Sequence, residues 1–116
     1  MNTINIDLKD RAFNFSVNII KLIDSLKCKD FTFQSILNQL IRSATSIGAN
    51  VNEAQGGISK KDFTVFFRHA FKSAIETEYW LALIKEAKNI DTNILINDCQ
   101  ILIRILAKSL KTLKEN

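Results

Sequence analysis

Three carboxylates, Glu53, Glu76 and Glu78, are the residues of this 116-residue chain whose placement could support metal binding or acid–base chemistry. Helical bundles that hold two metal ions place a histidine three residues after a glutamate. The single histidine, His69, has no glutamate at position 66 or 72, so this signature is missing. A histidine-activated nucleophile would also need an acidic residue that orients the imidazole. We therefore expect neither catalysis nor a metal or other cofactor.

Five polar residues with helical spacing lie within 33–55 and would share one face of a helix. They are Gln39, Arg42, Ser46, Asn50 and Glu53. One interpretation is a carboxylate site formed with Glu76 and Glu78. The other is a network of ion pairs and amides that fixes helix register, in which Arg42 meets Glu76 or Glu78 across an antiparallel helix pair. The missing metal signature favours the second. The residues predicted to form this structural polar network are Arg42, Asn50, Glu53 and Glu76.

Basic residues form two further stripes at helical spacing. One contains Lys61, Arg68 and Lys72, and the other contains Arg104, Lys108, Lys111 and Lys114. Such stripes suit contact with the phosphates of a nucleic acid. The alternative is a solvated face, and in the second stripe also a favourable position near a helix C-terminus, where the dipole attracts cations. The residues predicted as nucleic-acid contacts are Arg68, Lys72, Arg104, Lys108 and Lys111.

The elements that position these residues are expected to be long helices. The chain has no proline and only 3 glycines, whereas sandwiches and barrels of short strands need many more turn residues. Its composition, 47% hydrophobic and 24% charged, is typical of a folded globular protein. A length of 116 residues suits a single domain, 1–116.

Apolar residues recur every three or four positions in four segments, which predicts four helices. The predicted ranges are about 7–27, 33–55, 59–89 and 92–114. Short connections make successive helices antiparallel, so we predict an all-α, antiparallel up-down four-helix bundle. Gly48 costs about 1 kcal/mol relative to alanine inside a helix, which predicts close packing against another helix there.

The predicted helix ends carry recognisable capping residues. Ser59 suits the N-cap of the third helix, and Asp91 or Thr92 suits that of the fourth. Gly56 and Gly57 are expected to end the second helix, since glycine adopts the left-handed conformation that closes a helix C-terminus.

The third and fourth predicted helices carry more apolar residues than one stripe requires. Those beside the main stripes are Phe66, Phe71, Ile75, Tyr79 and Trp80 in the third, and Ile94, Ile96, Ile101, Ile103 and Ile105 in the fourth. Large apolar surfaces on the outside of a bundle usually mark an interface, so we predict self-association. The alternative is that the broad stripes belong to an irregular core.

The formal net charge of +4 permits an anionic partner. Cys28 and Cys99 stand singly, which indicates reduced thiols that act as small apolar side chains. No run of about 18 apolar residues predicts a membrane span, and residues 1–9 lack the pattern of a secretory signal. We expect a cytoplasmic protein.

Residues 39–56, QLIRSATSIGANVNEAQG, resemble the signature of the four-helix-bundle family related to the intervening-sequence proteins, which are encoded within insertions of bacterial large-subunit ribosomal RNA genes. The similarity continues through Ser59–Phe63, Ala70 and Ser73 to Glu76–Leu81. Two positions depart from the family pattern. The family often has proline where this chain has Gly48 or Ala49, and glycine where it has Ala54.

This resemblance implies a bacterial cytoplasmic four-helix bundle that assembles as a basic, ring-shaped homopentamer. The similar rings that accompany diversity-generating retroelements bind nucleic acid and a reverse transcriptase. We therefore predict a non-enzymatic oligomer that binds nucleic acid, in particular structured RNA, through its basic stripes. The alternative is a ring-shaped scaffold that recruits a protein partner such as a reverse transcriptase or another polymerase. Five copies at +4 each would carry a formal charge of +20.

Overall fold

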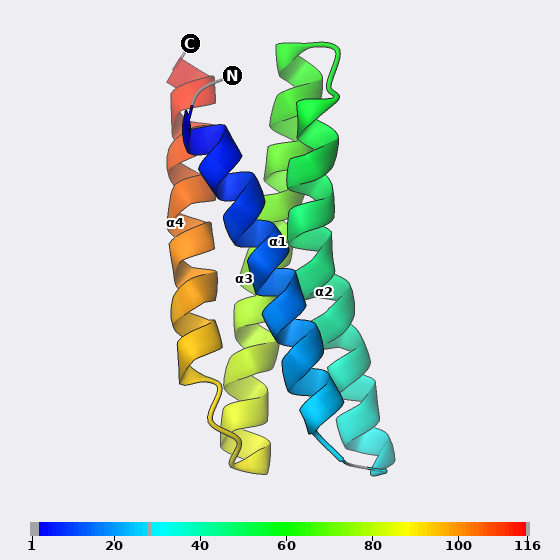
Figure 1. Cartoon of the computed structure of the whole chain (residues 1–116). Helices are drawn as coiled ribbons and strands as arrows, with labels where there is room; N and C mark the ends of the chain where they lie inside the picture. Colours follow the sequence, from blue (N-terminus) through cyan, green and yellow to red (C-terminus); the bar gives the residue numbers. More distant parts are fainter. Residues whose placement is uncertain (1–2, 28, 116) are drawn as a thin grey trace.

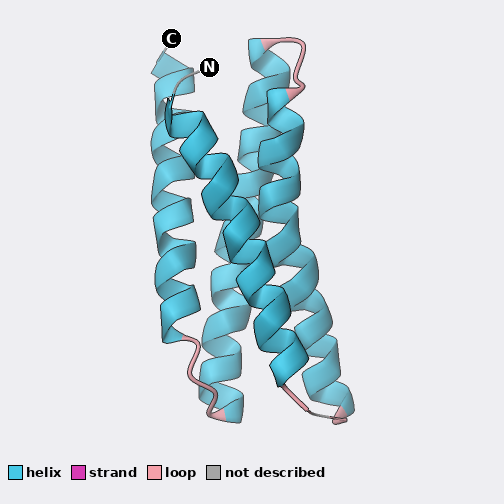
Figure 2. Ribbon diagram, in the orientation of Figure 1, coloured by secondary structure: helices cyan, strands magenta, loops and turns pink. Residues whose placement is uncertain are grey.

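The computed structural model describes residues 3–27 and 29–115. It consists of α1 (Thr3–Ser25), α2 (Phe31–Gln55), α3 (Lys60–Lys88) and α4 (Asn93–Glu115), joined by short loops (Figures 1 and 2). Successive helices run in opposite directions, which confirms the predicted all-α up-down four-helix bundle. The expected domain 1–116 includes residues 1, 2 and 116, and these lie outside the described residues, as does Cys28.

The bundle is elongated, with extents of 47 × 21 × 20 Å. α2 and α3 share the most extensive interface, and α1 packs against both α2 and α4. Figure 1 shows why the contact between α1 and α4 is the smallest of the four: α1 crosses the bundle obliquely, from α4 at one end to α2 at the other. The last turn of α4 and the turn between α2 and α3 lie at the same end of the molecule.

The predicted apolar stripes form the core. Buried members from each helix include Leu8 and Ile19 of α1, Leu40 and Ile47 of α2, Phe67 and Leu81 of α3, and Leu102 and Leu106 of α4. Burial of each such side chain stabilises the fold by about 1.5–3 kcal/mol. α1 approaches α2 closely at Gly48, where a Cβ atom would lie in van der Waals contact, 3.4 Å from the backbone oxygen of Ala12.

α1 ends and α2 begins two residues earlier than predicted, at Ser25 and Phe31. The expected connection extended to Thr32, but α2 begins at Phe31, and the amide of Gln34 bonds to the Asp30 carbonyl at 2.9 Å. The Asp30 carboxylate makes no cap hydrogen bond and instead pairs with Lys88 at the end of α3, at 2.9 Å. This hydrogen bond lowers the pKa of Asp30. The pair therefore joins the start of α2 to the end of α3.

The glycine prediction at the end of α2 was wrong in its conformation. Gly56 has φ −92° and ψ 5°, and neither described glycine of this turn is left-handed. The turn is closed by the amides of Gly56 and Gly57, which donate to the carbonyls of Glu53 and Ala54 at 3.0 and 3.1 Å. The left-handed residue is Asn89, at φ 58°, which ends α3.

The predicted N-cap of α3 is present, and one of the two candidates before α4 bonds to the first amide of that helix. Ser59 Oγ accepts a hydrogen bond from the Asp62 amide at 3.1 Å and caps α3. Before α4, the Asp91 carboxylate accepts from the Asn93 amide at 3.0 Å. Thr92 is buried, and its hydroxyl donates to the Leu81 carbonyl at 2.9 Å, so it ties α4 to α3 instead of capping its own helix.

Candidate nucleic-acid interface

The predicted polar network joins α2 to α3 through Arg42 and Glu76. The Arg42 guanidinium forms an ion pair with Glu76 and donates to Gln39 Oε1 at 2.9 Å. Glu76 Oε2 also accepts from the Trp80 indole N–H at 2.9 Å. One carboxylate thus holds two donors from neighbouring helices, and Arg42 meets Glu76 instead of Glu78.

A second part of the α2–α3 interface consists of hydroxyl groups. Ser73 Oγ donates to Ser46 Oγ at 3.1 Å, and the Asn50 amide donates to both the carbonyl and hydroxyl oxygens of Ser46. Nearer the middle of the bundle, the buried hydroxyl oxygens of Ser43 and Thr77 lie 2.9 Å apart. These pairs satisfy polar groups inside the interface and fix its register.

The network does not extend to Glu53, which was predicted as a member. Glu53 is exposed, and no hydrogen bond or ion pair joins its side chain to another described residue. It lies eleven residues beyond Arg42 along α2, a rise of about 16 Å, so the two cannot share Glu76. Glu78 accepts from Gln100 of α4 at 2.8 Å instead. Within the described part of the chain, no three His, Cys, Asp or Glu residues are grouped so as to hold a metal ion.

Cys99 is a buried core residue of α4. Its thiol donates to the Ala74 carbonyl of α3 at 3.2 Å. Burial and, to a smaller extent, the nearby carboxylates of Glu78 and Asp98 raise the pKa of the Cys99 thiol to about 12. The thiol is therefore a neutral packing group near pH 7, and it is unsuited to nucleophilic chemistry.

The basic residues predicted from the sequence are all exposed on α3 and α4. Because these helices are antiparallel, the first half of α3 lies beside the second half of α4. Arg68 and Lys111 line one groove between the helices, and Lys114, absent from the predicted contacts, joins them there. The groove has a volume of about 580 Å³, and its other lining residues are Thr64, Ala107, Leu110 and Leu113. The remaining predicted contacts, Lys72, Arg104 and Lys108, lie outside its lining.

Charge is strongly segregated along this helix pair. Residues 60–74 carry four cations and one carboxylate, and so do residues 104–115, which together give +6. The other halves, 75–91 and 93–103, carry two cations and five carboxylates, which give −3. The positive end contains the groove, so a polyanion would be attracted to that end of the molecule.

A smaller hollow lies next to this groove, where the α2–α3 turn meets the end of α4. Its volume is about 350 Å³, and it is lined by Ala54, Gln55, Gly57, Ser59, Lys60, Phe63 and Leu113. Leu113 is common to both hollows. The ring of Phe63 stacks on that of Phe67, with centroids 4.4 Å apart. Both polar atoms of the Gln55 side chain are buried without a hydrogen-bond partner among the described residues.

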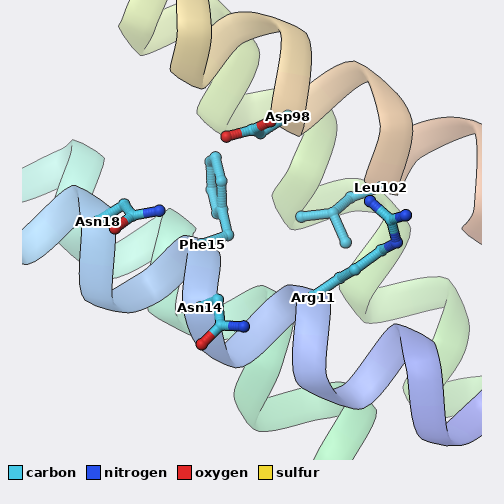
Figure 3. Close-up of a pocket in the computed structure, with 6 residues that line it drawn as sticks. All are labelled: Arg11, Asn14, Phe15, Asn18, Asp98 and Leu102. Atoms are coloured by element: carbon cyan, nitrogen blue, oxygen red, sulfur yellow. The ribbon is translucent and has the colours of Figure 1, made fainter.

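Another hollow lies in the seam between α1 and α4, and Figure 3 shows its lining. Phe15 points from α1 toward α4 beside Asp98, and Arg11 extends toward Leu102. Arg11 also pairs with Asp7 at 3.4 Å. The volume of about 200 Å³ is small, and the presence of Asp98 makes this seam less suited to an anion than the α3–α4 groove.

A model of the 23S rRNA-intervening sequence protein family matches residues 5–108. The chain belongs to this family. The intervening-sequence fold is also seen in a crystal structure of a protein with unknown function from the S23 ribosomal protein family of Bacteroides thetaiotaomicron VPI-5482. That protein is 35% identical, with a TM-score of 0.82 over 90% of this chain and 98% of the other. A search of curated proteins found no match.

The intervening-sequence match covers α2 and α3 in full, together with most of α1 and α4. It therefore includes the Arg42–Glu76 network but less than half of the lining of the basic groove, because Leu110, Lys111, Leu113 and Lys114 lie beyond its last residue. None of the helices in the described residues combines the length and the apolar composition that a membrane span requires.

Proposed function

We propose that this intervening-sequence protein is a non-enzymatic homo-oligomer that binds structured RNA through the positive end of the α3–α4 pair. The observation that carries the proposal is the segregation of +6 onto one end of this pair, around a groove in which Arg68, Lys111 and Lys114 converge. Phosphates are attracted to such a surface irrespective of base sequence, so recognition would depend on backbone and shape.

Exposed apolar residues on the same helices support self-association. Ile75, Tyr79 and Ile94 are 45, 60 and 79% exposed on α3 and α4. Apolar side chains of this size that remain in water favour a protein interface. Five copies, the number that the sequence resemblance implies, would combine five positive ends at a total formal charge of +20.

The same apolar residues favour one alternative function, a scaffold that recruits a protein partner such as a reverse transcriptase or another polymerase. The salt dependence of binding distinguishes the RNA-binding function from the scaffold function. RNA binding through phosphates weakens steeply as salt concentration rises, because each contact releases counterions. An apolar protein interface depends far less on salt.

The test is binding of a labelled RNA hairpin, measured by fluorescence anisotropy over a salt series. We expect Lys111→Glu and Arg68→Glu each to weaken binding at least tenfold and to reduce the salt slope by about 1. The control is Lys21→Glu, which makes the same charge change at an exposed position on α1. Equal effects of all three substitutions, or no hairpin binding by the unaltered protein at low salt, would overturn the proposal.

A further inference from the structure

The two hollows at the positive end of the bundle are neighbours, because Leu113 lines both. The larger hollow extends along α3 and α4, and the smaller one ends at the α2–α3 turn. Figure 1 places this turn and the last turn of α4 at the same end of the molecule. A ligand that spans both hollows would therefore contact three helices.

The chemistry of this lining is mixed. Four cations, Lys60, Arg68, Lys111 and Lys114, line the two hollows, and no carboxylate of a described residue does. The same linings also contain Phe63 and the apolar residues Leu110 and Leu113. An anionic ligand that also presents an apolar or aromatic surface would use both kinds of contact.

The combination of cations with an aromatic ring favours unpaired over paired nucleic acid. A duplex stacks its bases inside and offers mainly phosphates and sugars to a protein surface. An unpaired nucleotide offers a phosphate together with the face of its base, which stacks on aromatic side chains. Gln55, whose buried carboxamide has no hydrogen-bond partner among the described residues, lines the smaller hollow together with Phe63.

We propose that these hollows bind unpaired nucleotides of an RNA, in loops, bulges or single-stranded ends, with a base on Phe63 and the adjoining phosphates on Lys60, Arg68, Lys111 and Lys114. This inference rests on the proposed function and makes it narrower. The volumes of about 350 and 580 Å³ lie in the range of sites for single small ligands, so they favour individual nucleotides over an acidic peptide helix.

The test compares two labelled probes at one salt concentration, a single-stranded oligouridylate and an RNA duplex with the same number of phosphates. Phe63→Leu keeps an apolar side chain next to Phe67 but removes the stacking surface. We expect it to weaken binding of the single strand about tenfold and to leave binding of the duplex unchanged. The control is Phe71→Leu, which alters another partly buried phenylalanine of α3 outside both hollows.

A second variant guards against a general loss of structure. Phe63→Trp enlarges the aromatic surface and should tighten binding of the single strand severalfold, an effect that damage to the fold would not produce. Duplex binding equal to or tighter than single-strand binding, or equal effects of Phe63→Leu and Phe71→Leu, would overturn the inference. If either result is found and Lys111→Glu still weakens binding of the hairpin, the proposed function stands without the inference about unpaired nucleotides. If neither probe nor the hairpin binds, the inference and the proposed function both fail.

Discussion

At the level of single residues, a small number of polar contacts joins α2 to α3 beside their apolar core. The ion pair of Arg42 with Glu76 is partly open to water, with the two side chains 57 and 35% exposed. Exposed pairs contribute little to stability because water and salt screen them. The same Glu76 carboxylate also accepts from Trp80, so the contact gains more from its hydrogen-bonded geometry than from charge alone.

Arg42→Ala is expected to lower the free energy of unfolding by about 1 kcal/mol or less, because Glu76 keeps its bond to Trp80. It should not weaken RNA binding at a fixed oligomeric state, since Arg42 lies on α2, outside both basic hollows. Urea unfolding and light scattering measure the effect, with Asn38→Ala, at an exposed position of α2 outside the network, as the control. An unchanged melting temperature together with an unchanged mass would contradict the structural role of Arg42.

The Cys99 thiol gives a pH-dependent prediction. Its pKa of about 12 in the folded protein exceeds the usual value of about 8.5 for an unfolded chain. Between these values the unfolded chain loses a proton that the folded protein keeps. Stability from this group is therefore complete below about pH 8.5 and falls by about 1.4 kcal/mol per pH unit above it.

Urea unfolding at pH 8, 9 and 10 measures this slope. Cys99→Ala removes the titrating thiol, so the free energy of unfolding of this variant should fall less steeply between pH 8 and pH 10 than that of the unaltered protein. The loss of the buried side chain lowers stability at every pH and does not change this slope. Parallel slopes for the two proteins would show that the thiol does not titrate in this way.

At the level of helices, both ends of α3 follow the chemistry of the residues located there. The exception is the end of α2, where the glycines do not adopt the predicted left-handed conformation. Ser59 caps α3 as its sequence position indicates, because a serine oxygen suits the free amide three residues on. Asn89 closes the other end of α3 in the left-handed conformation, which asparagine adopts more readily than most residues. The turn after α2 contains two glycines and needs no such conformation.

Asn89→Ala is expected to lower the free energy of unfolding by about 1 kcal/mol, because alanine is strained at a φ of 58°. Asn89→Gly should leave stability unchanged or raise it slightly, since glycine adopts this φ without strain. Thermal unfolding, monitored by circular dichroism, distinguishes the alanine variant from the glycine variant. Equal melting temperatures for the alanine and glycine variants would argue against a left-handed end to α3.

At the scale of the whole molecule, one end of the α3–α4 pair is positive and the other negative, and both helices expose apolar side chains. Self-association through the apolar residues would bury surface that water disfavours and would also multiply the positive ends. Light scattering distinguishes any such assembly from a monomer, because the mass of an assembly is a multiple of the 13.2 kDa mass of the chain.

We expect the mass in solution to be a multiple of 13.2 kDa, five chains being the number that the resemblance implies. The double substitution Tyr79→Ser and Ile94→Ser should reduce this mass without loss of helical circular dichroism, since both side chains are exposed. The control is Phe13→Ser, which alters an exposed aromatic residue of α1. A monomeric wild-type protein would contradict self-association.

The four helices, their antiparallel order, the buried stripes and the cap at Ser59 could all be predicted from the sequence. These features depend on local periodicity and on neighbours a few residues apart, which a single chain displays directly. The sequence also indicated the five predicted phosphate contacts and the pairing of Arg42 with a carboxylate of α3.

Which of those residues converge is visible in the three-dimensional arrangement of the helices and not in the sequence. This arrangement pairs Arg42 with Glu76, directs Glu78 to Gln100, leaves Glu53 outside the network and brings Lys114 beside Arg68. Such partners depend on the register between helices, and a shift of one turn, about 5.4 Å, would exchange them while preserving every apolar stripe. Register is set by packing across the whole interface, and the periodicity of one helix carries no information about it.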